Sequence, residues 1–227
     1  MSAGGGLASP RLRRLASRAA AEPAPPAEAP GERCELCAEP LPEEHRHLLD
    51  VEARRLLCAC RACSLLLDNR AAGGSHYRLV PDRRLMLDGF VLDDAGWAAF
   101  RIPVDVAFVV VSSAAGRAVA FYPGPMGATE SLVELDAWED VVRANPVLAG
   151  MEDDVEALLV NRACGAREAW LVPVDECYAL VGLLRTRWRG LGGGEEVWRE
   201  LDGFYDGLRR HARRVGIDGA RIEGGTG

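Results

Sequence analysis

Apolar positions follow the period of an α-helix in the last third of the chain. Two segments, 174–188 and 197–211, carry a stripe of residues at steps of three and four. The stripe positions are Val174, Cys177, Val181, Leu184, Trp188, Val197, Leu201, Phe204, Leu208 and His211. That spacing places them on one face of each helix. The sequence therefore predicts two amphipathic helices, separated by a glycine-rich loop at 190–194.

The middle of the chain has the pattern of β-strands. Three short apolar runs, 104–112, 117–122 and 131–135, are separated by turn-forming residues at Gly116 and at 123–125. This order predicts an antiparallel meander. Residues 169–172 are expected to form a further strand. The run 155–161 fits either a strand or a helix, because so short a segment has no decisive period.

Shorter elements complete this region. We expect a small hairpin from 77–81 and 84–87, and a helix over 93–100 with two aspartates at its positive N-terminal end. Another helix is expected over 136–144, ending before Pro146. Together these elements predict an α+β domain over 76–216, with a mainly antiparallel sheet and C-terminal helices.

The N-terminal part differs in composition. Residues 1–31 are rich in proline and alanine, so we expect a disordered tail that buries nothing. Residues 32–70 are expected to form a small zinc-ribbon-like module with short strands at 45–51 and 54–58. Residues 217–227 are expected to form a flexible C-terminal tail.

Composition and charge narrow the class of partner. With 48% hydrophobic and 27% charged residues, the chain can bury a core. Its net charge of −7 argues against a nucleic-acid partner, since affinity for phosphates comes from Lys and Arg. No apolar run approaches the roughly 20 residues that span a bilayer, and the N-terminal arginines precede no apolar signal core. We therefore expect a cytoplasmic protein without a transmembrane segment.

Cysteine spacing gives the strongest chemical signal. Four of the seven cysteines form two CxxC pairs, Cys34 with Cys37 and Cys60 with Cys63, separated by 22 residues. Each CxxC turn directs two thiolates to one point, and the strands between them bring the turns together, as in a zinc ribbon. Four sulfur ligands suit zinc, and they also suit a mononuclear iron or an iron–sulfur cluster. The sequence predicts that these four cysteines hold one metal ion.

Two neighbours are additional candidate ligands. Cys58 lies two positions before Cys60, and we expect it to face away from the site and stay outside it. For His47, between the two pairs, hydrogen bonding or packing is favoured over a ligand role. The sequence shows no nucleophile–base motif, phosphate-binding loop or dinucleotide-binding turn, so it predicts no catalytic residue. Cys177 is expected to be a packed core thiol.

A set of short stretches carries a family resemblance. They are Cys34-Glu-Leu-Cys37, His45-Arg-His47-Leu-Leu-Asp50, Cys58-Ala-Cys60-Arg-Ala-Cys63, Tyr77-Arg-Leu-Val-Pro81, Arg101-Ile-Pro103-Val-Asp105 and Val172-Pro-Val-Asp175-Glu-Cys177-Tyr178-Ala-Leu-Val-Gly182. Together they resemble an uncharacterised actinobacterial family, domain of unknown function 5947. The resemblance implies an association with operons of high-affinity, uptake nickel–iron hydrogenases and their scaffold and maturation proteins. It implies no established activity.

These observations leave three functions to compare. The favoured one is a metal-binding accessory protein for assembly of, or electron transfer by, a nickel–iron hydrogenase, with a hydrogenase subunit or maturation factor as partner. The second is an enzyme of unknown chemistry with a structural zinc site, in which Cys58 acts as a reactive thiol. The third is a zinc-ribbon nucleic-acid-binding protein, disfavoured because the module carries more acidic residues than arginines.

Overall fold

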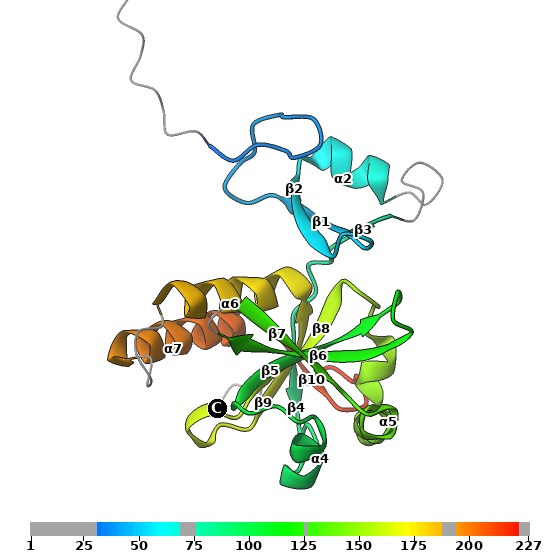
Figure 1. Cartoon of the computed structure of the whole chain (residues 1–227), viewed down its shortest axis with the longest axis vertical. Helices are drawn as coiled ribbons and strands as arrows, with labels where there is room; N and C mark the ends of the chain where they lie inside the picture. The colour runs from blue at the N-terminus through cyan, green and yellow to red at the C-terminus, as the bar shows by residue number, and fades with distance from the viewer. Residues whose placement is uncertain (1–30, 69–75, 125–126, 188–193, 223–227) are drawn as a thin grey trace, which may run out of the picture.

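The computed structural model describes residues 31–68, 76–124, 127–187 and 194–222 (Figure 1). Its elements are β1 (Arg46–Asp50), β2 (Arg55–Ala59), α2 (Arg61–Leu67), β3 (Tyr77–Leu79), β4 (Leu85–Asp88), α4 (Asp94–Ala99), β5 (Val106–Ser112), β6 (Arg117–Gly124), β7 (Gly127–Leu132), α5 (Leu135–Ala144), β8 (Glu156–Asn161), β9 (Glu168–Pro173), α6 (Val174–Arg187), α7 (Gly194–His211) and β10 (Arg213–Gly216). The predicted tail at 1–31 lies outside these residues, except for its last position. The predicted α+β class, with mainly antiparallel sheets and C-terminal helices, is confirmed.

The smaller sheet has the order β2-β1-β3, with both neighbours antiparallel to β1. One of its faces is apolar: Leu48, Leu57 and Ala59 are buried against α2. The helix was not predicted, because its seven residues are too few to show a period. In Figure 1 this sheet and α2 stand above the rest of the molecule.

The predicted hairpin from 77–81 and 84–87 is wrong. Strand β3 pairs with β1, with Leu79 opposite Leu48, whereas β4 pairs with β9 and β10 in the larger sheet. The pairing with β1 continues past the strand, since the Val80 N–H donates to the His47 carbonyl at 3.0 Å. The residues between β3 and β4 contain no glycine or asparagine that would favour a tight turn, so the chain crosses from one sheet to the other.

The larger sheet has seven strands in the order β10-β4-β9-β8-β5-β6-β7. The meander of β5, β6 and β7 is confirmed, and 156–161 is a strand between β5 and β9. The third strand of the meander lies earlier than predicted, at 127–132, and α5 already begins at Leu135. Strand β10 was missed; it lies parallel to β4, and this pairing joins residues more than a hundred positions apart.

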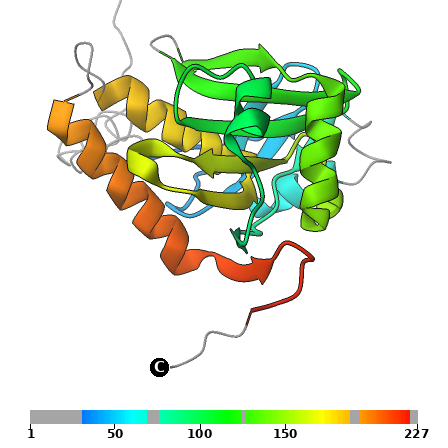
Figure 2. The same cartoon turned by 90° about the horizontal axis from the view of Figure 1, so that it is seen from below.

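Helices cover both faces of this sheet. On one face Phe108, Leu159 and Trp170 are buried with α6 and α7, and on the other Leu158 and Leu171 are buried with α4 and α5. Figure 2 shows the helices on both sides of the sheet. Successive strand residues point to opposite faces, so a strand covered on both sides must be apolar throughout. This is why the run at 155–161 showed no alternation.

The two C-terminal helices have the predicted faces, with local differences. Cys177 is fully buried, as expected for a core thiol. In α7 Tyr205 is buried and the predicted Phe204 only partly so, and the Tyr205 ring stacks on Trp170 at 5.2 Å between centroids. His211 is exposed instead, and its ring bonds to the Gly207 carbonyl. Trp188 lies outside the described residues. The buried stripe therefore ends one turn earlier than the sequence predicted.

The face of the smaller sheet opposite α2 packs against the α+β domain. Leu49 belongs to the core around α6, with Leu56 packed against it. Polar contacts surround this apolar junction: Arg78 donates to the Asp153 carbonyl at 2.5 Å, and His47 Nδ1 lies 2.8 Å from Asp175. The small sheet thus uses one face to hold α2 and the other to contact the α+β domain.

Removing the metal should leave the larger fold intact. Its two cores are built mainly from the seven-stranded sheet and four helices, and the small sheet adds only a few residues, such as Leu49, to one of them. We expect a strong chelator to leave most of the far-ultraviolet circular dichroism unchanged. Loss of all secondary structure on chelation would contradict this expectation, since it would show that the ribbon and the α+β domain fold as one unit.

Candidate metal centre

The structure brings the four CxxC cysteines to one point. Their sulfur atoms all lie within 4.8 Å of one another, and Cys37 Sγ and Cys60 Sγ are 3.7 Å apart. Four sulfurs about 2.3 Å from a zinc ion in a tetrahedron are about 3.8 Å apart. A disulfide would require about 2.05 Å, and all seven cysteines are free. The cluster has the dimensions of a tetrathiolate metal site.

The first pair lies in a tight turn before β1. The Ala38 N–H donates to the Cys34 carbonyl and the Cys34 N–H to the Glu39 carbonyl, each at 2.8 Å. Ala38 takes a positive φ of 63°, a left-handed conformation that closes the turn after Cys37. Cys34 is buried, whereas Cys37 is exposed. The turn therefore places Cys34 in the interior and Cys37 at the surface.

The second pair begins a helix. Strand β2 ends at Ala59, and Cys60 is the N-cap of α2, its sulfur accepting the N–H of Cys63 at 3.5 Å. An N-cap side chain normally accepts such a bond through oxygen. Here the Cys60 sulfur accepts the bond instead. The first turn of α2 therefore fixes the spacing of the two ligands Cys60 and Cys63.

Glu35, which lies between the two cysteines of the first pair, connects the first turn to the strand that leads to the second pair. Its carboxylate accepts the Cys58 N–H at 2.8 Å, and its own N–H donates to the Cys58 carbonyl at 2.9 Å. Arg55 adds a longer contact at 3.4 Å. Sequence reasoning missed this residue, because a glutamate between two cysteines of a turn carries no signal of its own.

The electrostatics of the cluster favour a bound cation. Burial raises the pKa of Cys34, but backbone N–H groups of Cys60, Leu36 and Cys37 point at its sulfur and lower the pKa to about 6. Burial and the three neighbouring sulfurs raise the pKa of Cys63 to about 12. Adjacent thiolates repel each other, so the group cannot ionise fully by itself. A divalent cation would stabilise all four thiolates at once.

Cys58 lies beside this cluster and outside it. The geometric reason given from the sequence is wrong, because residues two apart on a strand share a face. What separates Cys58 from Cys60 is the end of β2 at Ala59, after which the chain turns into α2. Cys58 groups instead with His45 and His47. The hydrogen bond that the His47 ring donates to the Asp175 carboxylate raises the pKa of His47.

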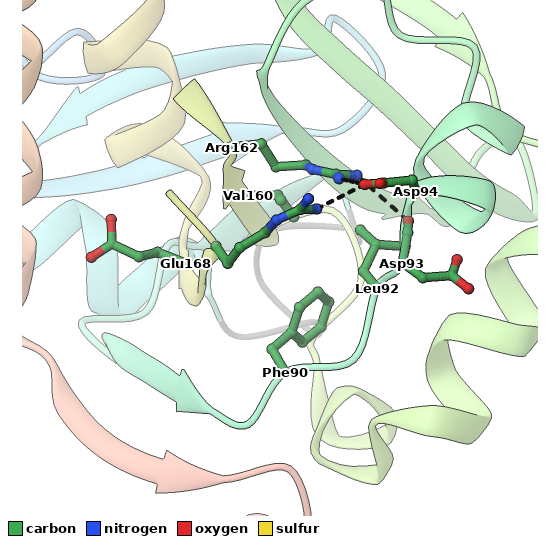
Figure 3. Close-up of a pocket in the computed structure, with 8 residues that line it drawn as sticks. Phe90, Leu92, Asp93, Asp94, Val160, Arg162 and Glu168 are labelled. Carbon is green, nitrogen blue, oxygen red and sulfur yellow. Dashed lines mark hydrogen bonds and ion pairs between the residues drawn. The ribbon is translucent and has the colours of Figure 1, made fainter. Parts of the chain in front are cut away.

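A different hollow, of about 360 Å³, lies at the far side of the larger sheet (Figure 3). Arg162 and Arg167 both contact the Asp94 carboxylate there, the latter at 2.9 Å. Arg162 also lies 5.2 Å from the centre of the Trp97 ring. The other carboxylates of the hollow are also engaged, since Glu168 accepts from Arg209 and Asp93 accepts the Gly96 N–H, so the hollow does not present an open ligand set.

A scan against family models matches residues 33–212 to a family of unknown function, DUF5947. The chain belongs to DUF5947. The match covers both the cysteine cluster and the α+β domain, so the two parts of the fold belong to one family unit. Searches of the curated proteins and of the solved structures found no match. Among the described residues, no helix is long and apolar enough to cross a bilayer.

Proposed function

We propose that this protein is a metal-binding accessory protein that acts in the cytoplasm in the assembly of, or electron transfer by, a nickel–iron hydrogenase. Cys34, Cys37, Cys60 and Cys63 hold a structural zinc ion. Its partner is a hydrogenase subunit or maturation factor. The metal-binding part is supported by the tetrathiol cluster, and the hydrogenase part by the resemblance of the quoted stretches to the hydrogenase-associated family.

One observation carries the accessory role: two adjacent leucines are exposed on the helix that the metal site anchors. Leu65 and Leu66 on α2 are 62% and 61% exposed. Leu65 lines a hollow of about 710 Å³, whose lining combines charged residues with further apolar ones, among them Leu41 and Leu79. Adjacent exposed leucines next to an apolar hollow are typical of a protein-binding surface.

Zinc would give this surface a fixed shape. Two of its four ligands lie in the first turn of α2 and the two others in the facing turn, so the ion would hold the helix against β1 and β2. A short helix of seven residues has little stability by itself. Zinc supplies four strong bonds without redox chemistry, which suits a structural role.

Metal identity is tested on the purified protein by elemental analysis and visible absorption. A colourless protein with zinc supports the structural assignment. A brown or red protein with iron would replace it with a mononuclear iron or iron–sulfur centre and a redox role.

The partner is tested by affinity capture from cells that express a nickel–iron hydrogenase. Wild-type protein is expected to capture hydrogenase subunits or maturation factors, and the Leu65→Arg/Leu66→Arg variant to lose them. Val91→Arg is the matched control, since Val91 is 50% exposed but lies beyond β4 in the α+β domain. Absence of hydrogenase components from the wild-type capture, or equal capture by the double variant, would contradict the proposal.

A further inference from the structure

A second group of metal-binding side chains lies on the other face of the small sheet. Cys58 on β2 is the direct cross-strand partner of His47 on β1. His45 precedes His47 by two positions, so it extends from the same side of the chain. One nitrogen of each ring and Cys58 Sγ all lie within 4.8 Å of one another. The two rings meet edge to face, 4.9 Å between centroids.

Each histidine ring has one nitrogen engaged and the other available. His45 Nδ1 is 3.1 Å from the Pro42 carbonyl, and His47 Nδ1 is 2.8 Å from Asp175 Oδ2. Both groups only accept hydrogen bonds, so they place the N–H on Nδ1, which in the neutral imidazole leaves a lone pair on Nε2. Holding the far nitrogen in this way is how proteins orient metal-binding imidazoles.

The Nε2 atom of His45 is buried and has no hydrogen-bond partner among the residues that the structure describes. The His45 side chain is only 8% exposed, and the unpartnered atom is completely shielded from solvent. A Glu32 carboxylate oxygen lies 3.6 Å away, which is too long for a hydrogen bond. It is close to the separation of about 3.3 Å between nitrogen and oxygen ligands of one tetrahedral zinc ion. Leaving a buried acceptor unpaired is unfavourable, and a bound cation would remove that cost.

Asp175 is itself held in place. It lies in the first turn of α6, and its second oxygen accepts the Glu176 N–H at 2.9 Å. The carboxylate that orients His47 therefore belongs to the α+β domain, while the histidines and Cys58 belong to the small sheet. The group lies where the two parts of the fold meet.

An acidic cavity opens on this group. It has a volume of about 580 Å³, and its lining includes both histidines, His211, five carboxylates and Arg84. The carboxylates are Glu43, Glu44, Asp82, Asp175 and Glu176. A concave surface with this excess of negative charge concentrates cations and gives an ion a path to the imidazoles.

We propose that His45 Nε2, His47 Nε2 and Cys58 Sγ form a second metal site that binds one divalent transition-metal ion, zinc by its donor set. Two imidazoles and one thiolate are ligands that zinc accepts in combination. The fourth position is left for water or for Glu32, whose carboxylate oxygen lies 3.6 Å from His45 Nε2. Three protein ligands with an open position are typical of a reactive or exchangeable ion, in contrast to the closed four-cysteine site. This inference does not depend on the proposed hydrogenase partner.

The test is a zinc titration of the full-length protein with elemental analysis after desalting. Wild-type protein is expected to bind two equivalents, of which a mild chelator removes one. Cys58→Ser and His45→Gln should each bind one equivalent, which resists the same chelator. Cys164→Ser and His76→Ala are matched controls, because these residues are exposed and outside both clusters, and they should keep two.

Cobalt(II) provides an independent readout. Wild-type protein with two cobalt ions should show the strong thiolate absorption of the four-cysteine site plus a weaker component that Cys58→Ser removes. His45→Gln removes a different ligand of the same site, so misfolding of Cys58→Ser alone could not explain a loss in both variants. Circular dichroism checks that both variants are folded. A single equivalent in wild-type protein, or two in Cys58→Ser and His45→Gln, overturns the second site while leaving the four-cysteine site standing. Loss of the chelator-resistant equivalent from wild-type protein would instead count against the structural zinc ion.

Discussion

Replacing Cys60 with serine is expected to remove the tightly bound ion and to unfold the small module. Cys60 supplies both a metal ligand and the N-cap of α2, so one substitution removes two supports of the same helix. Structural zinc sites contribute apparent binding free energies of about 10 to 16 kcal/mol at neutral pH, more than a module of this size can replace. Elemental analysis should find less than a tenth of the wild-type zinc, and limited proteolysis should cleave within 31–68.

Cys58→Ser is the matched control for this result. The residue lies in the same strand-to-helix segment, yet outside the four-sulfur cluster, so this variant should keep the chelator-resistant ion and resist proteolysis. If Cys58→Ser loses that ion while Cys60→Ser retains it, the ligand assignment is wrong. If both are required, the centre is a cluster or a five-thiol arrangement.

A second large effect is expected from Arg83→Met in the α+β domain. Glu156 on β8 is completely buried, and Arg83 Nε donates to its carboxylate at 2.7 Å. Apart from Arg83, the contact described for this carboxylate is the Glu152 N–H at 2.8 Å. Removing one partner of a buried pair costs about 3 to 5 kcal/mol. Because Arg83 is 36% exposed, we expect the lower value, about 3 kcal/mol, and a fall in Tm of about 6 to 12 °C.

Two variants separate this explanation from a general loss of packing. Arg214→Met removes a comparable two-bond ion pair with Asp88, but Arg214 is 59% exposed, so its loss should lower the Tm much less than Arg83→Met does. Adding Glu156→Gln to Arg83→Met removes the unpaired charge and should recover part of the Tm. Thermal unfolding followed by circular dichroism measures all three. Equal melting of Arg83→Met and Arg214→Met would refute the buried-charge argument.

Sequence reasoning succeeded where the signal was local and repeated. The two C-terminal helices follow from apolar positions at steps of three and four, and the meander follows from three runs divided by turn residues. Sequence reasoning failed where the strands that pair lie far apart in the sequence. Strand β3 leaves its neighbour in the chain to join β1, and β10 joins β4 across the whole domain, because the hydrogen-bonding edges available to them were created by other segments.

By itself, the sequence determined which residues could bind a metal: four cysteines at CxxC spacing direct their sulfurs together wherever a hairpin joins the turns. Only the tertiary structure decided what surrounds them. The end of β2 at Ala59 turns Cys60 toward the cluster and leaves Cys58 opposite His47. Asp175, 128 positions from His47, meets its ring because the small sheet packs on the N-terminus of α6. No local pattern encodes such a contact, since it depends on how two separately formed surfaces fit together.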